Sequence, residues 1–525
     1  MAVPVGVRAS RDGRAWRVRV DTLQDLRILA VASVGAAQLT DVEVSVVGCR
    51  SPQGWMGRPG LAHVDRLDVV RKGERAEVRM SLTTPTDAAR VLAAALRVLC
   101  PTGSPTDPQQ LTFAPGLSEA AAALAQSIHD VATVDRDRHV RRADMVVAPD
   151  EAVASAIDHS TSLVIGPVGW TRDGVPFEVC VDPAVHNPIG RPSHGLERVL
   201  TSRVRDGALE LGGGLRPRRI PGDITEKDVA YLADTRAIVG EVPTRQARQL
   251  AACGILIAPS ASELPSDALD GEAASVHERR HALRQHGPWV AMDAWPSVSI
   301  IMSTHRAAHV DHALAQIAGL RYPRLEVLIA AHGDSVNVDE LRAKAASLPY
   351  ETSVIRVDSS QNLGQALQAL TVAASGELVT KMDDDDHYGP EHIWDLVLAR
   401  AYSGAQVVGK TLDWIHLEAQ GVTVFRPVYS AEAYADFVCG GTMLISRGDL
   451  LSVGGWRPVP KSVDRALLDR VLDDGGLVYR THGLGYVYVR RADGHTASVS
   501  DEHFLKKNVS RVEGLVRHRE FGTQS

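Results

Sequence analysis

The sequence predicts an α/β protein with a mainly parallel sheet in its C-terminal half, preceded by a mixed α/β region with a β-rich start. Almost continuously apolar runs at 298–302 and 325–329 alternate with helical patterns, which is typical of strands buried on both faces. Residues 1 to about 80 alternate apolar and polar side chains instead, as half-buried strands do. Four consecutive aspartates, Asp383 to Asp386, directly follow an apolar run. Open α/β sheets bind ligands at such strand ends.

The composition indicates a folded protein of several domains. Its 525 residues exceed what one hydrophobic core organises, and length alone predicts about two to four domains. The net charge of -7 argues against a surface that coats nucleic acid. Five widely spaced cysteines give neither a disulfide framework nor a zinc knuckle, which favours a reducing cytoplasm. The start resembles no signal peptide and no apolar run is long enough for a membrane span, so we expect neither export nor insertion.

The first half is expected to contain two units and a linker. Strand-like runs at 16–20 and 42–47 predict a small β-rich unit over residues 1–80. Residues 81–270 read as an α/β region of uncertain role. It has a helix at about 88–95, a loop at 101–108, a second helix to about 134, and strands at 162–166 and 254–258. A polar helix from 272 to about 285 makes 271–295 a linker helix.

Residues 296–510 are expected to form the domain that carries the function. Strands are predicted at 298–302, 325–329, 377–382 and 486–490. Asn362 caps one of the intervening helices and Gly376 ends it. The apolar faces of the helices are predicted from Val310, Leu314 and Ile317, from Leu363, Ala366, Leu367 and Leu370, and from Leu467, Leu468 and Val471.

The aspartate run predicts a divalent cation at the strand end. Adjacent carboxylates repel one another, and Mg²⁺ or Mn²⁺ relieves this while binding substrate phosphates. The substrate is therefore expected to be phosphorylated. If the backbone stays extended, Asp384 points away from Asp383 and Asp385, and Asp386 caps the following turn. Asp384 and Asp386 are then mainly structural.

Several motifs in order resemble the family 2 glycosyltransferases of the GT-A fold, over about residues 296–503. Residues 299–305 resemble the opening strand and nucleotide-contacting turn, and 361–364, Gln-Asn-Leu-Gly, resemble the start of the third helix. Asp383-Asp384-Asp385 falls at the Asp-x-Asp metal motif. Residues 439–447 and 453–456 resemble acceptor-side segments, and Val463-Asp464 is similar to the Glu-Asp pair that holds the catalytic base.

The chain also departs from this family. Ser303 replaces the usual Pro, Arg306 the usual Asn, and Val463 the Glu of the Glu-Asp pair. The segment Ala330-Ala331-His332 stands where a carboxylate commonly holds the nucleotide base. The nucleotide is therefore left open.

The resemblance implies a metal-dependent, inverting transferase of the hexosyltransferase kind. It would move a sugar from a nucleotide-diphosphate donor to an acceptor hydroxyl, with Asp464 as catalytic base and Mn²⁺ or Mg²⁺ as cofactor. The implied metal ligands are Asp383, Asp385 and the late loop residue His495, and the implied acceptor-side residues are Gly441 and Trp456. Residues implied in nucleotide-sugar binding are Thr304, His305, Arg306, His332, Asp334, Asn362, Gly364, Lys381, Asp383 and Asp384. A carbohydrate, a lipid-linked molecule or a small molecule is the acceptor, and peripheral membrane association stays open.

Three other interpretations are weighed. A sugar nucleotidyltransferase uses a related fold and a metal, but needs a Gly-rich loop after its first strand, and residues 303–308 contain no Gly. A degenerate carbohydrate-binding or scaffold module is the second. His277-Glu278-Arg279-Arg280-His281 matches the H-E-x-x-H zinc pattern. We interpret that match as accidental, because such helices usually carry apolar residues at the x positions.

The role of residues 1–270 is left between two alternatives. Residues 237–259 resemble the nucleotide-side half of GT-B glycosyltransferases. No G-x-G-x-x-G after a strand and no P-loop is found there, so an independent dinucleotide or ATP site lacks support. The region is expected to recognise the acceptor or to be a vestigial second transferase domain.

Overall fold

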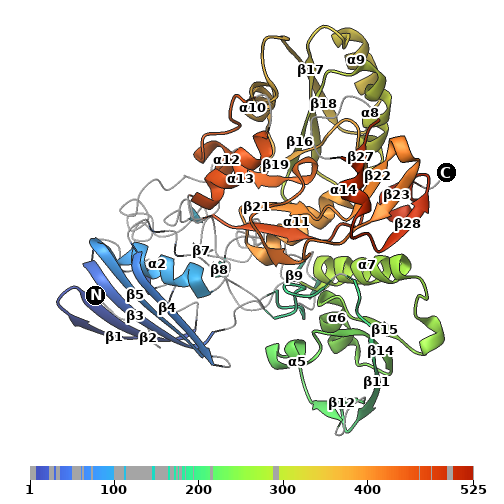
Figure 1. Ribbon diagram of the computed structural model, residues 1–525. Helices are drawn as coiled ribbons and strands as arrows, with labels where there is room; N and C mark the ends of the chain where they lie inside the picture. Colours follow the sequence, from blue (N-terminus) through green and yellow to red (C-terminus); the bar gives the residue numbers. More distant parts are fainter. Residues whose placement is uncertain are drawn as a thin grey trace.

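The protein is described from a computed structural model, shown in Figure 1. The structure describes most of residues 7–99, five short strands between 112 and 176, residues 180–287 apart from 184, 193 and 213–216, and residues 295–523 apart from 460–461, 474–475 and 493–499. The predicted loop at 101–108, the helix expected after it, and His495 lie outside the described residues.

A five-stranded sheet forms the start of the chain, in the order β1-β2-β3-β5-β4. Strands β2 and β3 are parallel and the other neighbours antiparallel. Helix α2 (Ala88–Leu99) confirms the predicted helix and shares a buried core with the sheet. The sheet runs past the expected limit at residue 80, because its last strand continues to Asp87. The strands are β1 (Val7–Asp12), β2 (Ala15–Thr22), β3 (Gln38–Gly48), β4 (Val64–Lys72) and β5 (Arg75–Asp87).

The middle of the chain contains a second five-stranded sheet, in the order β13-β12-β11-β14-β15. Its strands β11, β14 and β15 are parallel. The elements are β11 (Arg198–Arg205), β12 (Ala208–Leu211), β13 (Arg218–Ile220), α5 (Glu226–Tyr231), β14 (Thr235–Gly240), α6 (Thr244–Ala252), β15 (Leu256–Ala258) and η1 (Ala261–Glu263). The short strands before them are β6 (Thr112–Phe113), β7 (Met145–Val147), β8 (Leu163–Ile165), β9 (Thr171–Arg172) and β10 (Val175–Pro176).

The largest sheet lies in the C-terminal half and has the order β18-β17-β16-β19-β25-β21-β26-β24. Its first four strands are parallel, which confirms the predicted α/β architecture. Their carboxyl ends therefore meet at one edge. The strands are β16 (Val298–Thr304), β17 (Leu325–His332), β18 (Glu351–Val357), β19 (Leu378–Lys381), β21 (Val407–Lys410), β24 (Ala433–Tyr434), β25 (Leu444–Ser446) and β26 (Val478–Thr481).

Helices cover both faces of this sheet. Alternate residues of β16 enter different cores, because Ile300 and Met302 pack with α8, α9 and α11, whereas Ile301 packs with α10, α12 and α13. Figure 1 shows the two groups of helices on either side of the strands. The helices are η3 (Ala307–His309), α8 (Val310–Ala318), α9 (Val338–Ala345), α10 (Leu363–Ala373), α11 (His392–Ser403), η5 (Gly440–Thr442), α12 (Arg447–Ser452) and α13 (Val463–Asp473).

A smaller sheet, in the order β20-β27-β22-β23-β28, stands beside the large one. Its strand β20 follows the aspartate run directly, so the four aspartates connect the two sheets. The elements are β20 (His387–Tyr388), β22 (Trp414–Leu417), η4 (Glu418–Gln420), β23 (Val422–Phe425), β27 (Tyr486–Arg490), α14 (Asp501–Leu505), β28 (Ser510–Glu513) and η6 (Arg519–Phe521). Strand β28 and η6 extend this unit beyond the limit expected at residue 510.

Helix α7 (Ala268–His286) contains the polar helix expected as a linker. It is joined to the C-terminal unit by buried charges, because Arg279 pairs with Glu432 at 2.9 Å and Arg280 with Asp395 at 2.9 Å. The helix is therefore part of the packed structure. None of the described helices combines the length and apolarity needed to cross a bilayer.

Candidate active site

The four aspartates diverge because the chain turns directly after β19. Residues 384 and 385 form a turn between β19 and β20. Asp383 and Asp385 keep partly exposed side chains, whereas Asp384 and Asp386 are 2% and 1% exposed. The backbone therefore does not stay extended through the run. Each aspartate has its own set of partners.

Lys381 joins Asp383 to Asp464. Its Nζ lies 2.8 Å from Asp383 Oδ1 and 3.5 Å from Asp464 Oδ1, and the side chain is almost fully buried. Although burial lowers it, the two carboxylates raise the pKa of Lys381. Burial raises the pKa of Asp464, and Lys381 opposes that shift. The predicted donor-side carboxylate and the predicted base thus share one ammonium group.

Two glycines let the chain pass closely over these carboxylates. A Cβ on Gly440 would lie 2.2 Å from Asp464 Oδ2, and one on Gly441 would lie 2.8 Å from Asp383 Oδ2. Any larger residue at position 440 would move the Asp464 side chain. Gly441 therefore lies against Asp383, the predicted donor-side carboxylate, and Gly440 lies against the predicted base.

On the other side of the run, Arg306 bridges Asp384 and Asp385. Arg306 Nη1 donates to Asp385 Oδ2 at 2.8 Å, and Nη2 donates to Asp384 Oδ1. Thr304 Oγ1 also donates to Asp384 Oδ2, at 2.5 Å. Asp384 therefore points toward Asp385 and the loop after β16, contrary to the expectation that it points away. Burial raises the pKa of Asp385, and Arg306 opposes that shift.

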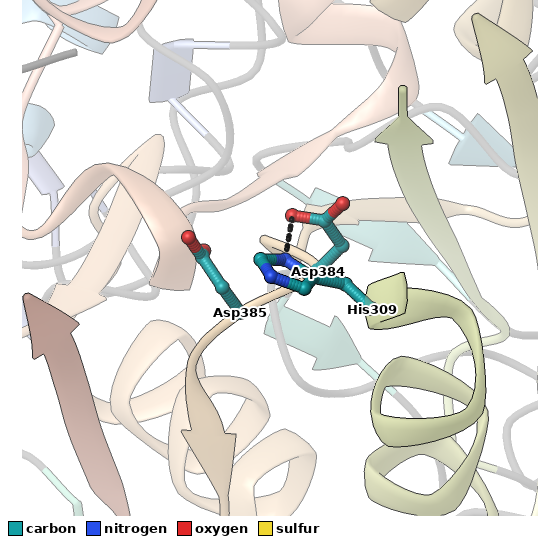
Figure 2. Close-up of side chains that lie close together, drawn as sticks. All are labelled: His309, Asp384 and Asp385. Atoms are coloured by element: carbon teal, nitrogen blue, oxygen red, sulfur yellow. Dashed lines mark ion pairs between the residues drawn. The ribbon is translucent and has the colours of Figure 1, made fainter. Parts of the chain in front are cut away.

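His309 completes a group of possible metal ligands with Asp384 and Asp385, drawn in Figure 2. One ligand atom from each residue lies within 4.8 Å of the others, and His309 Nδ1 is 3.8 Å from Asp384 Oδ1. That nitrogen is buried and has no hydrogen-bond partner in the described residues. Burial lowers the pKa of His309, with a further contribution from Arg306. A neutral imidazole of this kind is a good metal ligand.

Asp386 is structural, although it does not cap the following turn as expected. Its carboxylate accepts hydrogen bonds from Tyr486 Oη at 2.7 Å and from Val489 N at 2.8 Å. Burial raises the pKa of Asp386 well above its usual value. The residue ties the turn to β27 and so fixes the two sheets next to the site.

The predicted nucleotide-side residues lie along the same edge of the large sheet. The Ser335 hydroxyl donates to His305 O, and His332 Nε2 lies 2.8 Å from Gln361 O. The loops after β16 and β17 and the segment before α10 are thereby brought together. Asp334 has an 81% exposed side chain and pairs with Arg356. The described contacts do not join it to the aspartate run.

Asn362 and Gly364 have evident structural tasks. Asn362 forms the predicted cap, since its side chain accepts from Gln365 N while the Gln365 side chain accepts from Asn362 N. A Cβ on Gly364 would lie 1.7 Å from Arg457 O. Glycine at this position therefore allows α10 to pack against the segment after Trp456.

Trp456 is a core residue. It is 4% exposed, and its indole Nε1 donates to Thr371 Oγ1 at 3.0 Å within the core around α10. The predicted contact with an acceptor is not supported by this packing, because the ring is already surrounded. The Gly-Gly-Trp pattern locates the turn, but it does not determine whether the Trp456 ring points into the core or toward the site.

The H-E-x-x-H segment does not form a metal site among the described residues. His277, Glu278 and His281 are exposed on α7, whereas the intervening Arg279 and Arg280 are the buried residues. The helix thus turns its arginines inward to Glu432 and Asp395. The polar residue types at the x positions argue against a zinc site, and the burial of Arg279 and Arg280 gives the physical reason for those residue types.

The sequence interpretation did not identify His309 as a candidate metal ligand. A usable signal was present, because His309 follows β16 by five residues and β16 is the parallel neighbour of β19. Carboxyl ends of adjacent parallel strands lie together. That rule places the loop after Thr304 beside the aspartate run.

Comparisons with known proteins support the resemblance. Residues 299–416 match the family model for glycosyl transferase family 2. This match confirms the predicted family 2 glycosyltransferase resemblance over residues 299–416. None of the curated proteins compared with the chain matches it.

Two solved structures are similar over part of the chain. One is S. aureus TarS 1–349 in complex with UDP-GlcNAc, at 16% identity and a TM-score of 0.32, over 40% of this chain and 63% of that one. The other is the mannosyltransferase PcManGT from Pyrobaculum calidifontis in complex with GDP-Man and Mn²⁺, at 17% identity and a TM-score of 0.32, over 39% and 59%. The chain spans less than two-thirds of either.

Proposed function

Because the chain carries a family 2 glycosyltransferase domain, we propose that it transfers a sugar from a nucleotide-diphosphate donor to an acceptor hydroxyl, with a divalent cation and inversion at the anomeric carbon. The observation that carries this proposal is the Lys381 ammonium, which holds Asp383 and Asp464 within 3.5 Å of itself. Donor-side and acceptor-side carboxylates are thereby fixed relative to each other.

The residues of the aspartate turn fit a divalent cation. Asp385 is proposed as its main ligand, with Asp384 and His309 beside it, since their ligand atoms lie within 4.8 Å of one another. Asp383 would contact the ribose or reach the ion through water. A bound Mn²⁺ or Mg²⁺ would supply charge neutralisation at the departing diphosphate. Thr304, the last residue of β16, donates a hydrogen bond to Asp384, which keeps the carboxylates in place.

Asp464 is proposed as the base that accepts the proton of the acceptor hydroxyl. It lies in the first turn of α13, where the helix dipole favours an ionised carboxylate. Burial raises its pKa, which brings a carboxylate closer to the range useful for proton transfer near neutral pH. Its Oδ1 is buried and lies 3.5 Å from Lys381 Nζ, so the ammonium holds the carboxylate in place.

The donor nucleotide is proposed to lie along the edge formed by the ends of β16 and β17 and the start of α10, at Thr304, His305, His332 and Asn362. Their shared edge and the hydrogen bonds between them support this placement. His332 stands where a base-binding carboxylate is common, and we leave the base open. The acceptor is a carbohydrate, a lipid-linked molecule or a small molecule, and residues 1–270 are proposed to recognise it or to be a vestigial transferase domain.

A panel of nucleotide sugars with Mn²⁺ tests the proposal. Wild-type protein is expected to release the nucleoside diphosphate from one of them, and Asp385→Asn to lose about 10²-fold or more of that activity. Asp464→Asn should lose about 10²- to 10⁴-fold of transfer to an acceptor while it still binds the donor. Asp339→Asn is the control, because that carboxylate is 91% exposed on α9 and outside the cluster.

Equal activity in the Asp385 and Asp339 variants would contradict the assignment. Release of pyrophosphate from a nucleoside triphosphate and a sugar phosphate would favour a nucleotidyltransferase instead. Donor binding without turnover by the wild type, with every acceptor class, would favour a non-catalytic module.

A further inference from the structure

Arg306 occupies the carboxylates that a metal ion would need. One guanidinium donates to Asp385 Oδ2 at 2.8 Å and to Asp384 Oδ1, and both residues belong to the possible metal-ligand group with His309. A lone pair that accepts from Arg306 is not free to bind a cation. Arg306 and a metal ion therefore compete for the same two side chains.

The charges of the cluster favour an exchange between these two cations. Two carboxylates face one guanidinium, and His309 adds no charge when neutral, so one negative charge is left over. A divalent cation balances both carboxylates. Arg306 pairs with no other carboxylate in the described residues. A displaced guanidinium would therefore lack a protein counter-ion.

The contacts of Arg306 hold its main chain in place and leave its side chain able to move. Arg306 N donates to Thr304 Oγ1 at 3.3 Å, and Thr304 is itself bonded to Asp384. The Arg306 side chain is 27% exposed and its Nε has no hydrogen-bond partner in the described residues. The main chain is thus fixed to the site while the guanidinium borders solvent.

We propose that Arg306 is an exchangeable cation. It neutralises Asp384 and Asp385 when no metal is bound, and a divalent cation displaces it so that its guanidinium becomes a ligand of the donor diphosphate. The planar fork of arginine suits phosphate oxygens, and the diphosphate supplies the counter-ion that the displaced side chain needs. This inference rests on the proposed function, since it assumes a diphosphate donor.

The test is a titration of the full chain with Mn²⁺ alone, in which electron paramagnetic resonance measures the concentration of free Mn²⁺. Arg306→Gln is expected to bind Mn²⁺ about tenfold more tightly than wild type, because the competing charge-assisted hydrogen bonds are gone. Arg491→Gln is the matched control. Arg491 donates to the main-chain oxygen of Asp385 and pairs with Glu418, so it leaves the carboxylates free.

The second step is a titration with nucleoside diphosphates at saturating Mn²⁺. Arg306→Gln should then bind the preferred diphosphate about tenfold more weakly than wild type, although it binds Mn²⁺ more tightly. These opposite changes distinguish exchange from general damage to the site. Arg306→Lys keeps the positive charge but cannot form the same two parallel hydrogen bonds. Its affinities for Mn²⁺ and for the diphosphate should lie between those of wild type and Arg306→Gln, and it replaces the Gln variant in the test if that variant does not fold.

Unchanged or weaker Mn²⁺ binding by Arg306→Gln would show that Arg306 does not compete with the metal. If Arg491→Gln gains as much Mn²⁺ affinity as Arg306→Gln, the change is an effect of net charge and the proposed competition is wrong. Unchanged diphosphate binding would overturn the role of the displaced guanidinium. Asp385→Asn separates this inference from the proposed function. If that variant keeps wild-type Mn²⁺ affinity, the metal site itself is wrong, whatever Arg306 does.

Discussion

Lys381 is the residue that makes the candidate site one unit. Its ammonium lies between Asp383, at the end of β19, and Asp464, at the start of α13. Buried cations need such partners because the cost of desolvation is high. The same contacts restrain both carboxylates, so Asp383 and Asp464 keep a fixed spacing.

The approach of Gly440 to Asp464 gives a prediction at the residue scale. In Gly440→Ala the new Cβ would fall 2.2 Å from Asp464 Oδ2 and push the carboxylate aside. Transfer should fall about 10²-fold, as expected for a misplaced catalytic group, with donor binding little changed. Steady-state kinetics and donor titration measure the two effects.

Gly448→Ala is the control for that substitution. Gly448 lies in α12, only eight residues along the chain, and a Cβ there would meet nothing within 4 Å. If both alanine variants transfer equally well, Asp464 does not act from the position described.

At the scale of elements, the strands and helices of the C-terminal half followed from hydrophobic spacing. The segments β16, β17, α8 and α10 were predicted within a few residues, because each has a buried face with a regular period. The turn after β19 was not predicted. Four identical residues carry no periodicity, so the direction of each side chain depends on partners such as Arg306 and Tyr486, which come from other elements.

The loop before β22 provides a pH-dependent prediction. Asp413 is 2% exposed, and burial raises its pKa from 3.8 to about 7 against the opposing effect of Thr411. The folded state thus holds a proton that the unfolded chain releases at lower pH. Stability that is fully present below pH 3.8 is lost as the pH rises through about 7.

Asp413→Asn cannot ionise, so it should not lose this stability. The free energy of unfolding of the variant minus that of wild type should increase by on the order of 3 kcal/mol from pH 5 to pH 8. Urea unfolding at the two pH values measures this change. The exposed Asp436→Asn is the control. A difference between Asp413→Asn and wild type that is the same at both pH values would mean that Asp413 is ionised in the folded protein.

At the scale of the whole molecule, α7 joins the middle of the chain to the C-terminal unit. Arg279 reaches Glu432, which also accepts hydrogen bonds from Tyr402 and Tyr479. The sequence indicated a polar helix with an accidental zinc motif. It did not indicate burial of the arginines, because their carboxylate partners lie more than 100 residues away.

Arg279→Met should therefore destabilise the protein by about 3–5 kcal/mol, because Glu432 would stay buried without its counter-ion. Thermal unfolding measures the loss. His281→Ala on the same helix is the control, since His281 is exposed. Equal stability of the two variants would show that α7 is not anchored through this ion pair.

The central claim is that the aspartate turn binds a nucleoside diphosphate through a divalent cation. Calorimetric titration of the full chain with a panel of nucleoside diphosphates, with Mn²⁺ and with a chelator, tests it most directly. The account predicts that one diphosphate binds with Mn²⁺, and that its affinity falls about tenfold or more with the chelator and in Asp385→Asn. The claim would be contradicted if the affinity for the diphosphate were the same with the chelator and in Asp385→Asn, or if no diphosphate bound at all.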